Sequence, residues 1–374
     1  MLNFAKNNKL DLIMFENKYC YSFPAVRGQQ AGRPFYIATC PLRIIPKIFL
    51  FDEEEVPAEL RAQRSLNRTR LPEMVRYLVD NPKEYVFSSL TASVGTEVRF
   101  IPHEGAHDLG VLQVPMDAEI LINDGQHRRA AIEEALKEMP ELGQDNISVL
   151  FFVDEGLKRS QQMFADLNKY AVKPSPSISA LYDFRDSSAG VARYLATEIK
   201  PFVGFTEMEQ STVSPKSAKL FTLSSIKQAS QILLSKTAKS HFEDGDLQVA
   251  VSFWQACFGV IAEWQQVHNK ELSPANFRQE YIHAHGIGLH ALGRMGKSLI
   301  AQHPRDWQHV LQKLNKIDWR KSNPIWDNRA LHHGKLSKAS SNIKLTANIL
   351  RQALDLQLEG DDKKLEEEFA KKHV

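Results

Sequence analysis

One stretch constrains the fold of this chain more than any other. An apolar run over residues 118–122 stops at Asp124-Gly125, and a helical pattern over 128–137 follows at once. The run has the composition of a buried strand, and Ala, Ile and Leu recur at helical spacing after the turn. Asp124 is a favoured N-cap residue, and Gly125 permits a tight bend that leaves the backbone open to close approach. The sequence therefore predicts a strand, a tight turn and a helix in direct succession.

The predicted turn has the chemistry of an anion site. The first helical turn presents free N–H groups and the positive end of the helix dipole. Gln126, His127 and Arg128 stand beside them, and phosphate is the simplest anion for such a place. The competing interpretation is a capped turn whose His and Arg are solvated. The presence of donor, acceptor, imidazole and guanidinium at consecutive positions favours the phosphate site.

The string Asp124-Gly125-Gln126-His127-Arg128 matches the signature of the DGQHR-domain family, whose core resembles the ParB/sulfiredoxin-like fold. Residues 163–169, followed by Pro174-Ser175, are similar to the segment that follows this turn in the family. The likeness narrows to the DndB family of DNA sulfur modification proteins at residues 24–32 and 63–70, and it continues at 319–320 and 323–326. It therefore spans most of the chain.

This resemblance implies both a fold and a site. The expected fold class is α+β with an α/β core: a ParB/sulfiredoxin-like mixed-sheet domain over residues 1–160, then a mainly helical domain over 161–374. In the wider fold the equivalent turn cradles nucleotide phosphates. The expected catalytic residues are Asp124 and His127, and the expected nucleotide- or phosphate-binding residues are Gly125, Gln126, Arg128, Asn168, Arg27 and Gln29.

The last three of these residues lie outside the turn. Arg27 and Gln29 belong to a predicted loop that contains glycine and proline residues, and we expect this loop beside the turn. Equally, Arg27 could form an ion pair with a buried carboxylate. The family match places Asn168 near the phosphates, and a plain helix C-cap is the competing explanation.

The remaining patterns predict strands in the first domain and helices in the second. Strands are expected at 19–23, 35–39, 44–51, 85–92, 97–101 and 149–153, and helices at 58–80, 160–170, 178–199, 216–236, 246–268, 274–284, 287–301, 304–315 and 343–373. Pro72 is expected to start a second helix within 58–80. His103 and His107 fall in a predicted loop, so their spacing does not indicate a metal site, and no metal is expected.

Two basic clusters are candidates for DNA contact. The first contains Arg61, Arg64, Arg68, Arg70 and Arg76, of which the first three share one face if their segment is a single helix. Contact with the phosphates of a nucleotide or of DNA is one interpretation, and a solvated face paired with nearby glutamates explains the cluster equally well. Segment 313–344, the basic segment, interleaves cations with Trp319 and Trp326, which suits phosphate attraction and base stacking. Its candidate residues are Lys313, Lys316, Arg320, Lys321, Arg329, Lys335 and Lys338. The alternative is that both tryptophans are buried and the lysines are solubilising.

Residues 291–298 (Ala-Leu-Gly-Arg-Met-Gly-Lys-Ser) formally satisfy a relaxed phosphate-loop pattern. A true phosphate loop follows a strand, and the residues before this one do not form a strand pattern. Leu292, Met295 and Leu299 instead mark the apolar face of a helix, which is the structure expected here.

The composition limits the cellular setting. The 374 residues carry a net charge of only +2 and include three cysteines. Three scattered cysteines are too few for a disulfide framework, so a reducing cytoplasm is expected, with no membrane span or signal peptide. Cys40 has the pattern of a small buried residue at a strand end, and a redox or sulfur role would require a low pKa.

Two function classes follow from the motifs and the resemblance. The first is a cytoplasmic DNA-binding regulator of transcription in a bacterial DNA phosphorothioation system, which binds double-stranded DNA and holds a nucleotide at the DGQHR turn. The second is an NTP hydrolase of ParB-like fold coupled to DNA processing, with ATP or GTP and Mg²⁺ as its ligands. Other DNA sulfur modification proteins, and further copies of this chain, are the remaining expected partners. The sequence leaves the nucleotide, the DNA sequence and the oligomeric state open.

Overall fold

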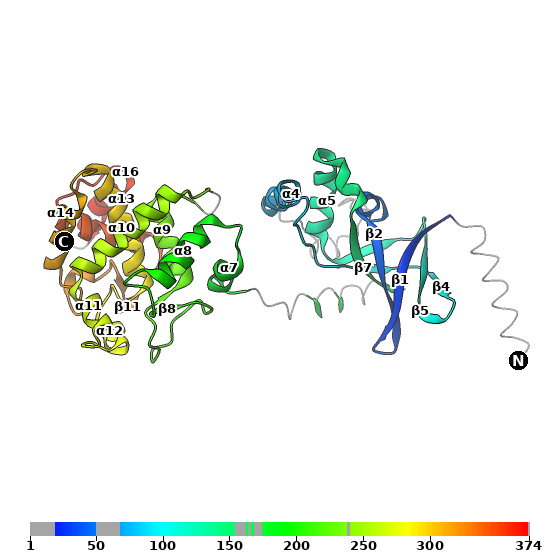
Figure 1. Cartoon of the computed structure of the whole chain (residues 1–374), viewed down its shortest axis with the longest axis horizontal. Coiled ribbons are helices and arrows are strands. Elements are labelled where there is room, and N and C mark those ends of the chain that lie inside the picture. The colour runs from blue at the N-terminus through cyan, green and yellow to red at the C-terminus, as the bar shows by residue number, and fades with distance from the viewer. Residues whose placement is uncertain are drawn as a thin grey trace, which may run out of the picture. The chain divides into compact units, whose positions relative to one another are not determined.

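The computed structural model describes residues 19–49, 68–153, 162–163, 166–167, 174–237 and 240–372. The chain divides into two compact units, Met1–Val172 and Lys173–Val374 (Figure 1). Each unit contains its own cluster of buried apolar side chains. The mixed α and β class expected from the sequence is confirmed.

A seven-stranded sheet forms the centre of the first unit, in the order β4-β5-β1-β2-β7-β3-β6. Only β3 and β7 pair in parallel; the other neighbours are antiparallel. The strands are β1 Cys20–Gln30, β2 Arg33–Pro41, β3 Leu90–Val94, β4 Arg99–His103, β5 Ala106–Pro115, β6 Ile120–Asp124 and β7 Asn146–Val153. The strand before the DGQHR turn, β6, is therefore an edge strand whose inner neighbour is β3.

Short helices surround this sheet. They are η1 Leu42–Ile44, α2 Ile45–Ile48, η2 Arg68–Arg70, α4 Leu71–Asp80, α5 Gln126–Glu138 and η3 Pro140–Gln144. Val75 and Leu78 of α4 and Ile132 of α5 are buried in the core of the unit, and α4 and α5 pack together (Figure 1). Pro72 stands in the first turn of α4, as the sequence predicts.

Three expectations about strands were wrong. The strand expected at 85–92 is present only from Leu90, where β3 begins. The strand expected at 44–51 is replaced up to Ile48 by η1 and α2, with Pro46 in the first turn of α2; proline has no N–H to donate to a sheet ladder. The loop expected around His103 and His107 is a β4–β5 hairpin, whose turn contains Gly105 with φ of +82°. Strand β5 was missed because its polar N-terminal half reads as a loop.

The second unit is mainly helical, as expected. Its helices are α7 Pro176–Tyr182, α8 Ser187–Glu198, α9 Leu223–Leu233, α10 Asp244–Val260, α11 Ala262–His268, α12 Pro274–Glu280, α13 Gly286–Gln302, α14 Trp307–Leu311, η4 Gln312–Lys316, η5 Pro324–Trp326, α15 Ser340–Ala353 and α16 Gly360–Lys372. Two small strand pairs complete it: β8 Thr206–Glu207 with β9 Phe221–Thr222, and β10 Leu331–His332 with β11 Lys335–Leu336. No helix in the described part of the chain combines the length and apolar character that a bilayer crossing requires.

Helix α13 packs against α9, α14 and α15. It contains the residues that match the relaxed phosphate-loop pattern. Residues 291–298 all lie inside the helix, as predicted. Glycine is needed there for close packing: a Cβ at Gly293 would lie 2.4 Å from the carbonyl oxygen of Ala229, and one at Gly296 would lie 2.4 Å from the ring of Phe253. These glycines serve contacts between helices rather than a phosphate.

Candidate phosphate turn and basic segment

The DGQHR turn joins β6 to α5 through Gly125, at a position that suits only glycine well. Gly125 is the N-cap of α5, with φ of +105°, and no side chain caps the helix. The expectation that Asp124 is the N-cap was therefore wrong, because the Asp124 carboxylate turns towards Arg128 instead. A left-handed conformation carries little cost only for glycine.

The space beside Gly125 is filled by the protein's own side chains. A Cβ at this position would lie 2.4 Å from Cδ2 of Leu90 and 3.1 Å from Nη2 of Arg128. Leu90 and Arg128 thus occupy the space in which a ligand was expected to approach the Gly125 backbone. Glycine is required here for packing as well as for the turn.

Gln126 faces into the protein. Its buried amide Nε2 donates to the carbonyl oxygens of Ile122 at 3.1 Å and Asn123 at 3.4 Å. Asn123, fully buried, donates from Nδ2 to Ser93 Oγ at 2.5 Å and to Met163 Sδ at 3.1 Å. The Gln126 amide thus ties the start of the helix to the end of β6, and the Asn123 amide ties the end of β6 to β3 and Met163.

Asp124 and Arg128 form an ion pair across the turn. Arg128 Nη2 lies 2.6 Å from Asp124 Oδ2, and Arg128 Nη1 donates to Ser88, reaching its carbonyl oxygen at 3.3 Å and also its hydroxyl. A phosphate at the first turn of α5 would lie beside a guanidinium that already has a counter-charge. Anion binding would then involve a shift of Arg128 from Asp124 towards the ligand.

His127 is half-buried on the first turn of α5. Burial lowers its pKa, the nearby charge of Arg70 lowers it further, and Asp124 acts in the opposite direction. The imidazole is therefore neutral at pH 7 and able to accept a proton. Arg70, at the end of η2, belongs to the arginine cluster for which the sequence suggested contact with the phosphates of a nucleotide or of DNA.

Arg129 is a further residue that sequence reasoning missed. It is 7% exposed, and it donates to the carbonyl oxygens of Phe49 at 3.2 Å and Pro46 at 3.1 Å while pairing with Glu133. These bonds fix α5 to the segment around α2, so of the two adjacent arginines Arg128 lies at the turn and Arg129 is structural.

Arg27 and Gln29 are not brought to the turn. Both lie on β1, which is separated from β6 by β2, β7 and β3, a lateral distance of roughly 19 Å for four strand spacings. Arg27 pairs at 3.4 Å with Asp108, whose side chain is 75% exposed, rather than with a buried carboxylate. The two residues line a surface hollow with Asp108 instead.

Four other candidates fall wholly or partly outside the described residues. Arg61, Arg64 and Asn168 lie outside them. Arg68 begins η2, and its side chain is also outside the description.

In the basic segment, the two tryptophans are buried. Trp319 is 2% exposed and Trp326 is fully buried; their rings stack with centroids 5.6 Å apart, and Trp326 Nε1 donates to the carbonyl oxygen of Asp318 at 3.0 Å. The alternative that both rings belong to the core is the one observed, so neither is exposed for base stacking.

The cations of the segment differ in their surroundings. Arg329 is 9% exposed and makes two bonds of 2.9 and 2.6 Å to Glu366. Lys313 pairs with Asp355 at 2.7 Å, and half-buried Lys321 donates to the carbonyl oxygen of Arg278 at 2.7 Å. The exposed members are Lys316, Arg320, Lys335 and Lys338.

The β10–β11 hairpin carries an exposed polar tip. His333 and Gly334 both have positive φ, of +48° and +72°, as a tight hairpin turn requires. His332, His333 and Lys335 are all exposed.

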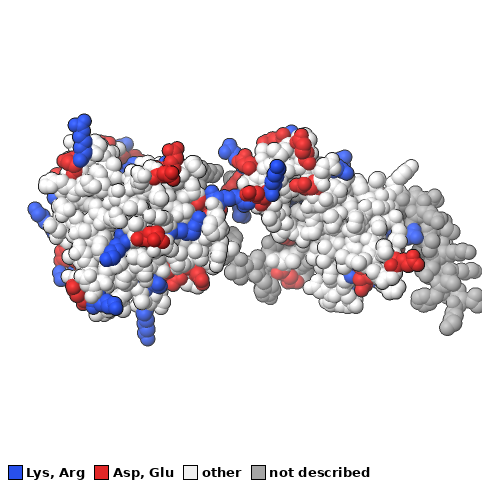
Figure 2. Space-filling model, viewed as in Figure 1, with Lys and Arg blue, Asp and Glu red and all other residues white. Residues whose placement is uncertain are grey.

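On the face shown in Figure 2, the described Lys and Arg side chains are interspersed with Asp and Glu on both units. Any surface for nucleic acid must therefore be local.

Comparison with known proteins gives a family. The family model described as "DndB: DNA-sulfur modification-associated" matches residues 23–357, which include both units. No curated protein and no solved structure matches the chain. The match extends from the first strand of the sheet through the DGQHR turn to the end of α15, and the chain belongs to the DndB family of DNA-sulfur modification-associated proteins.

Proposed function

We propose that this protein is a DNA-binding regulator of transcription in a DNA sulfur modification system, and that the basic segment of its second unit contacts the DNA. The observation that carries the proposal is the pair of exposed lysines Lys316 and Lys335. Among the described residues, the ion pairs of the segment involve other side chains: Lys313–Asp355, Arg320–Asp318 and Arg329–Glu366.

Cations that form no internal ion pair are suited to an external polyanion. Binding to DNA phosphates releases condensed counterions and so favours association. The β10–β11 hairpin adds an element of suitable shape, because a two-stranded ribbon fits the major groove of B-DNA. Its exposed His332, His333 and Lys335 offer donors for base edges or phosphates.

The test is a fluorescence-anisotropy titration with duplex DNA from the promoter of the modification genes, over a range of salt concentrations. The slope of log K against log salt is negative, and each lost phosphate contact reduces its magnitude by about 0.9. The Lys316→Gln/Lys335→Gln double variant is therefore expected to reduce the magnitude of the slope by about 1.8. The matched control is Lys363→Gln/Lys364→Gln, which removes the same charge from exposed positions of α16. An unchanged slope in the first variant, or an equal loss in the control, contradicts the placement of the DNA surface.

A second candidate function is NTP binding and hydrolysis at the DGQHR turn. The observation in its favour is that the first turn of α5 has no side-chain cap, while Arg70, His127 and Arg128 lie close to it. Here we propose that Arg128 exchanges Asp124 for a phosphate and that neutral His127 accepts a proton from the attacking water. Asp124, released, would contact the Mg²⁺ that arrives with the phosphates.

This candidate is tested by MgATP and MgGTP binding and turnover, with and without duplex DNA. Asp124→Ala and Arg128→Ala are expected to lose turnover while keeping the far-ultraviolet circular dichroism of the parent. Lys137→Gln, at the far end of α5, is the control because it changes charge on the same helix away from the turn. If the parent neither binds nor turns over either nucleotide, the hydrolase function is wrong; if Arg128→Ala unfolds, the turn is structural.

A further inference from the structure

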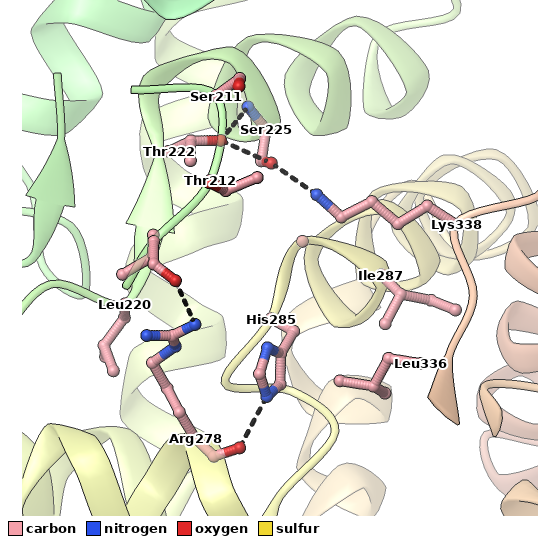
Figure 3. A pocket seen from close by; sticks show the side chains of 12 residues that line it. Ser211, Thr212, Leu220, Thr222, Ser225, Arg278, His285, Ile287, Leu336 and Lys338 are labelled. Carbon is pink, nitrogen blue, oxygen red and sulfur yellow. Dashed lines mark hydrogen bonds between the residues drawn. The ribbon is translucent and has the colours of Figure 1, made fainter. Parts of the chain in front are cut away.

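The second unit contains a pocket that neither proposal uses. It has a volume of about 190 Å³ and lies between the 211–213 loop, the start of α9, the end of α12, the start of α13 and the residues that follow β11 (Figure 3). Pockets that bury a whole drug-sized molecule are larger, about 300–1,000 Å³. This one therefore suits a small ligand or the end of a larger one.

Three cationic side chains converge on the pocket or its rim. Arg278 and Lys338 line it, and Lys321 reaches the carbonyl oxygen of Arg278 at 2.7 Å. Among the described residues no carboxylate pairs with any of the three. Their observed bonds go to neutral oxygens: those of Arg278 to the carbonyls of Val213 and Ser214, and that of Lys338 to Ser225.

The Arg278 guanidinium retains unused donor capacity. Two of its five N–H groups reach the carbonyl oxygens of the 213–214 loop. Its Nε is buried and has no hydrogen-bond partner. A buried donor without a partner is costly, and an oxyanion in the pocket is one group that would satisfy it.

The hydroxyl groups at the start of α9 contribute a further donor. Thr222 caps α9 by accepting from the Ser225 N–H at 3.2 Å, and its own hydroxyl donates to Ser225 Oγ at 2.8 Å. Lys338 Nζ also donates to Ser225 Oγ, at 3.4 Å. Because Ser225 Oγ accepts twice, its own hydrogen is left to donate to a third group.

Gly286 keeps the floor of the pocket open. It is the first residue of α13, and a Cβ there would lie 2.7 Å from both Lys338 Nζ and Ser225 Oγ. Any other residue would push the ammonium and the hydroxyl away from the start of the helix. The 17-residue helix α13 also directs the positive end of its dipole here, and no side chain caps it.

The positively charged groups around the pocket destabilise one another's protonated forms. Burial lowers the pKa of Lys321 and the charge of Arg278 lowers it further. Burial, followed by the charges of Lys321, Arg278 and Lys338, lowers the pKa of His285 to about 4, against the bond from its ring to the Arg278 carbonyl oxygen. Mutual repulsion of this kind is relieved by a bound anion.

We propose that this pocket binds the phosphoryl group of a small molecule, either free orthophosphate or the terminal phosphate of a nucleotide. A dianion would receive charge-assisted bonds from Arg278 and Lys338 and a hydroxyl bond from Ser225, which are the contacts that phosphate favours. The site belongs to the second unit and is separate from the DGQHR turn of the first.

The test is calorimetric titration of the full chain with orthophosphate and with AMP in 0.15 M sodium chloride. The parent is expected to bind one equivalent of at least one of them. Lys338→Gln is expected to weaken that binding about tenfold, as the loss of one charge-assisted bond implies, and Gly286→Ala is also expected to weaken it. Tighter binding of AMP identifies a nucleotide end as the natural ligand, and binding of orthophosphate alone identifies the free ion.

Two controls locate the binding. Lys335→Gln removes an exposed lysine of the β10–β11 hairpin, three residues before Lys338, and is expected to leave the affinity unchanged. Arg128→Ala, in the DGQHR turn, is expected to keep the binding that Lys338→Gln weakens and to lose only any additional phosphate or AMP bound at that turn, so the two sites are distinguished. The proposal is overturned if neither ligand binds the parent at millimolar concentration, or if Lys338→Gln binds as tightly as the parent.

Discussion

At the scale of single residues, the buried histidine of α13, His290, should make the stability of the second unit depend on pH. Burial, and then the charge of Lys338, lower the pKa of His290 to about 4, and this residue is 4% exposed. The unfolded value is about 6.5. Between pH 6.5 and 4 the unfolded chain therefore takes up a proton that the folded chain does not, so the free energy of unfolding falls as the pH falls. The contribution is complete above pH 6.5.

This prediction is checked by urea unfolding at several pH values between 7 and 4.5. His290 alone accounts for roughly 3 kcal/mol over the full window. His290→Gln should reduce the pH dependence without abolishing it, whatever its effect on stability at pH 7, because the pKa of His285 is also lowered to about 4. His332→Gln, which replaces an exposed histidine on the hairpin, should leave the slope as it is. Equal slopes for the parent and His290→Gln would show that His290 does not cause the pH dependence.

Single residues also show where sequence reasoning stops. Glycine at 125 was expected to open the backbone to a ligand, but its neighbours Leu90 and Arg128 fill that space. The sequence around Trp319 and Trp326 is compatible with exposed or with buried rings. Only the stacking of the two rings in the core shows that they are buried. In each case the deciding contact comes from residues that no local pattern identifies.

At the scale of elements, periodicity predicted the helices better than the strands. Helix α13, Gly286–Gln302, lies within one residue of the expected 287–301, because its apolar positions recur over more than four turns. The failures are of two kinds. Helix α2 has only four residues, and an apolar run of that length suits a strand or a helix equally. The single helices expected at 178–199 and 343–373 are each divided in two, as α7 and α8 and as α15 and α16. The order β4-β5-β1-β2-β7-β3-β6 depends on long-range pairing, and this is why Arg27 could not be placed relative to the turn in advance.

Helix α16 is a different kind of element, because it is held by charge rather than by apolar packing. None of its residues is buried. Its carboxylates instead pair with two arginines: Glu366 with Arg329, which lies between η5 and β10, and Asp362 with Arg351 of α15 at 2.7 Å. Arg329 thus has an internal ion-pair partner, whereas in the described part of the chain no ion pair includes Lys316 or Lys335, and this difference selects the residues proposed for DNA contact.

At the scale of the whole molecule, each unit has its own apolar core. All five tryptophans in the sequence lie at or beyond residue 254, in the second unit. Tryptophan fluorescence therefore reports on the second unit alone, while far-ultraviolet circular dichroism reports on both. A chain with two cores is expected to contain at least one part that folds by itself.

We therefore expect residues 174–374, produced without the rest of the chain, to fold. The core of this fragment includes fully buried Trp254, Trp264 and Trp326, so its fluorescence should be shifted to short wavelength and should change in one cooperative transition on addition of urea. The full chain, followed by the same signal, is the control. An insoluble fragment, or a gradual change without a transition, would show that the second unit depends on the first. A folded fragment would also allow the phosphate pocket and the basic segment to be studied apart from the DGQHR turn.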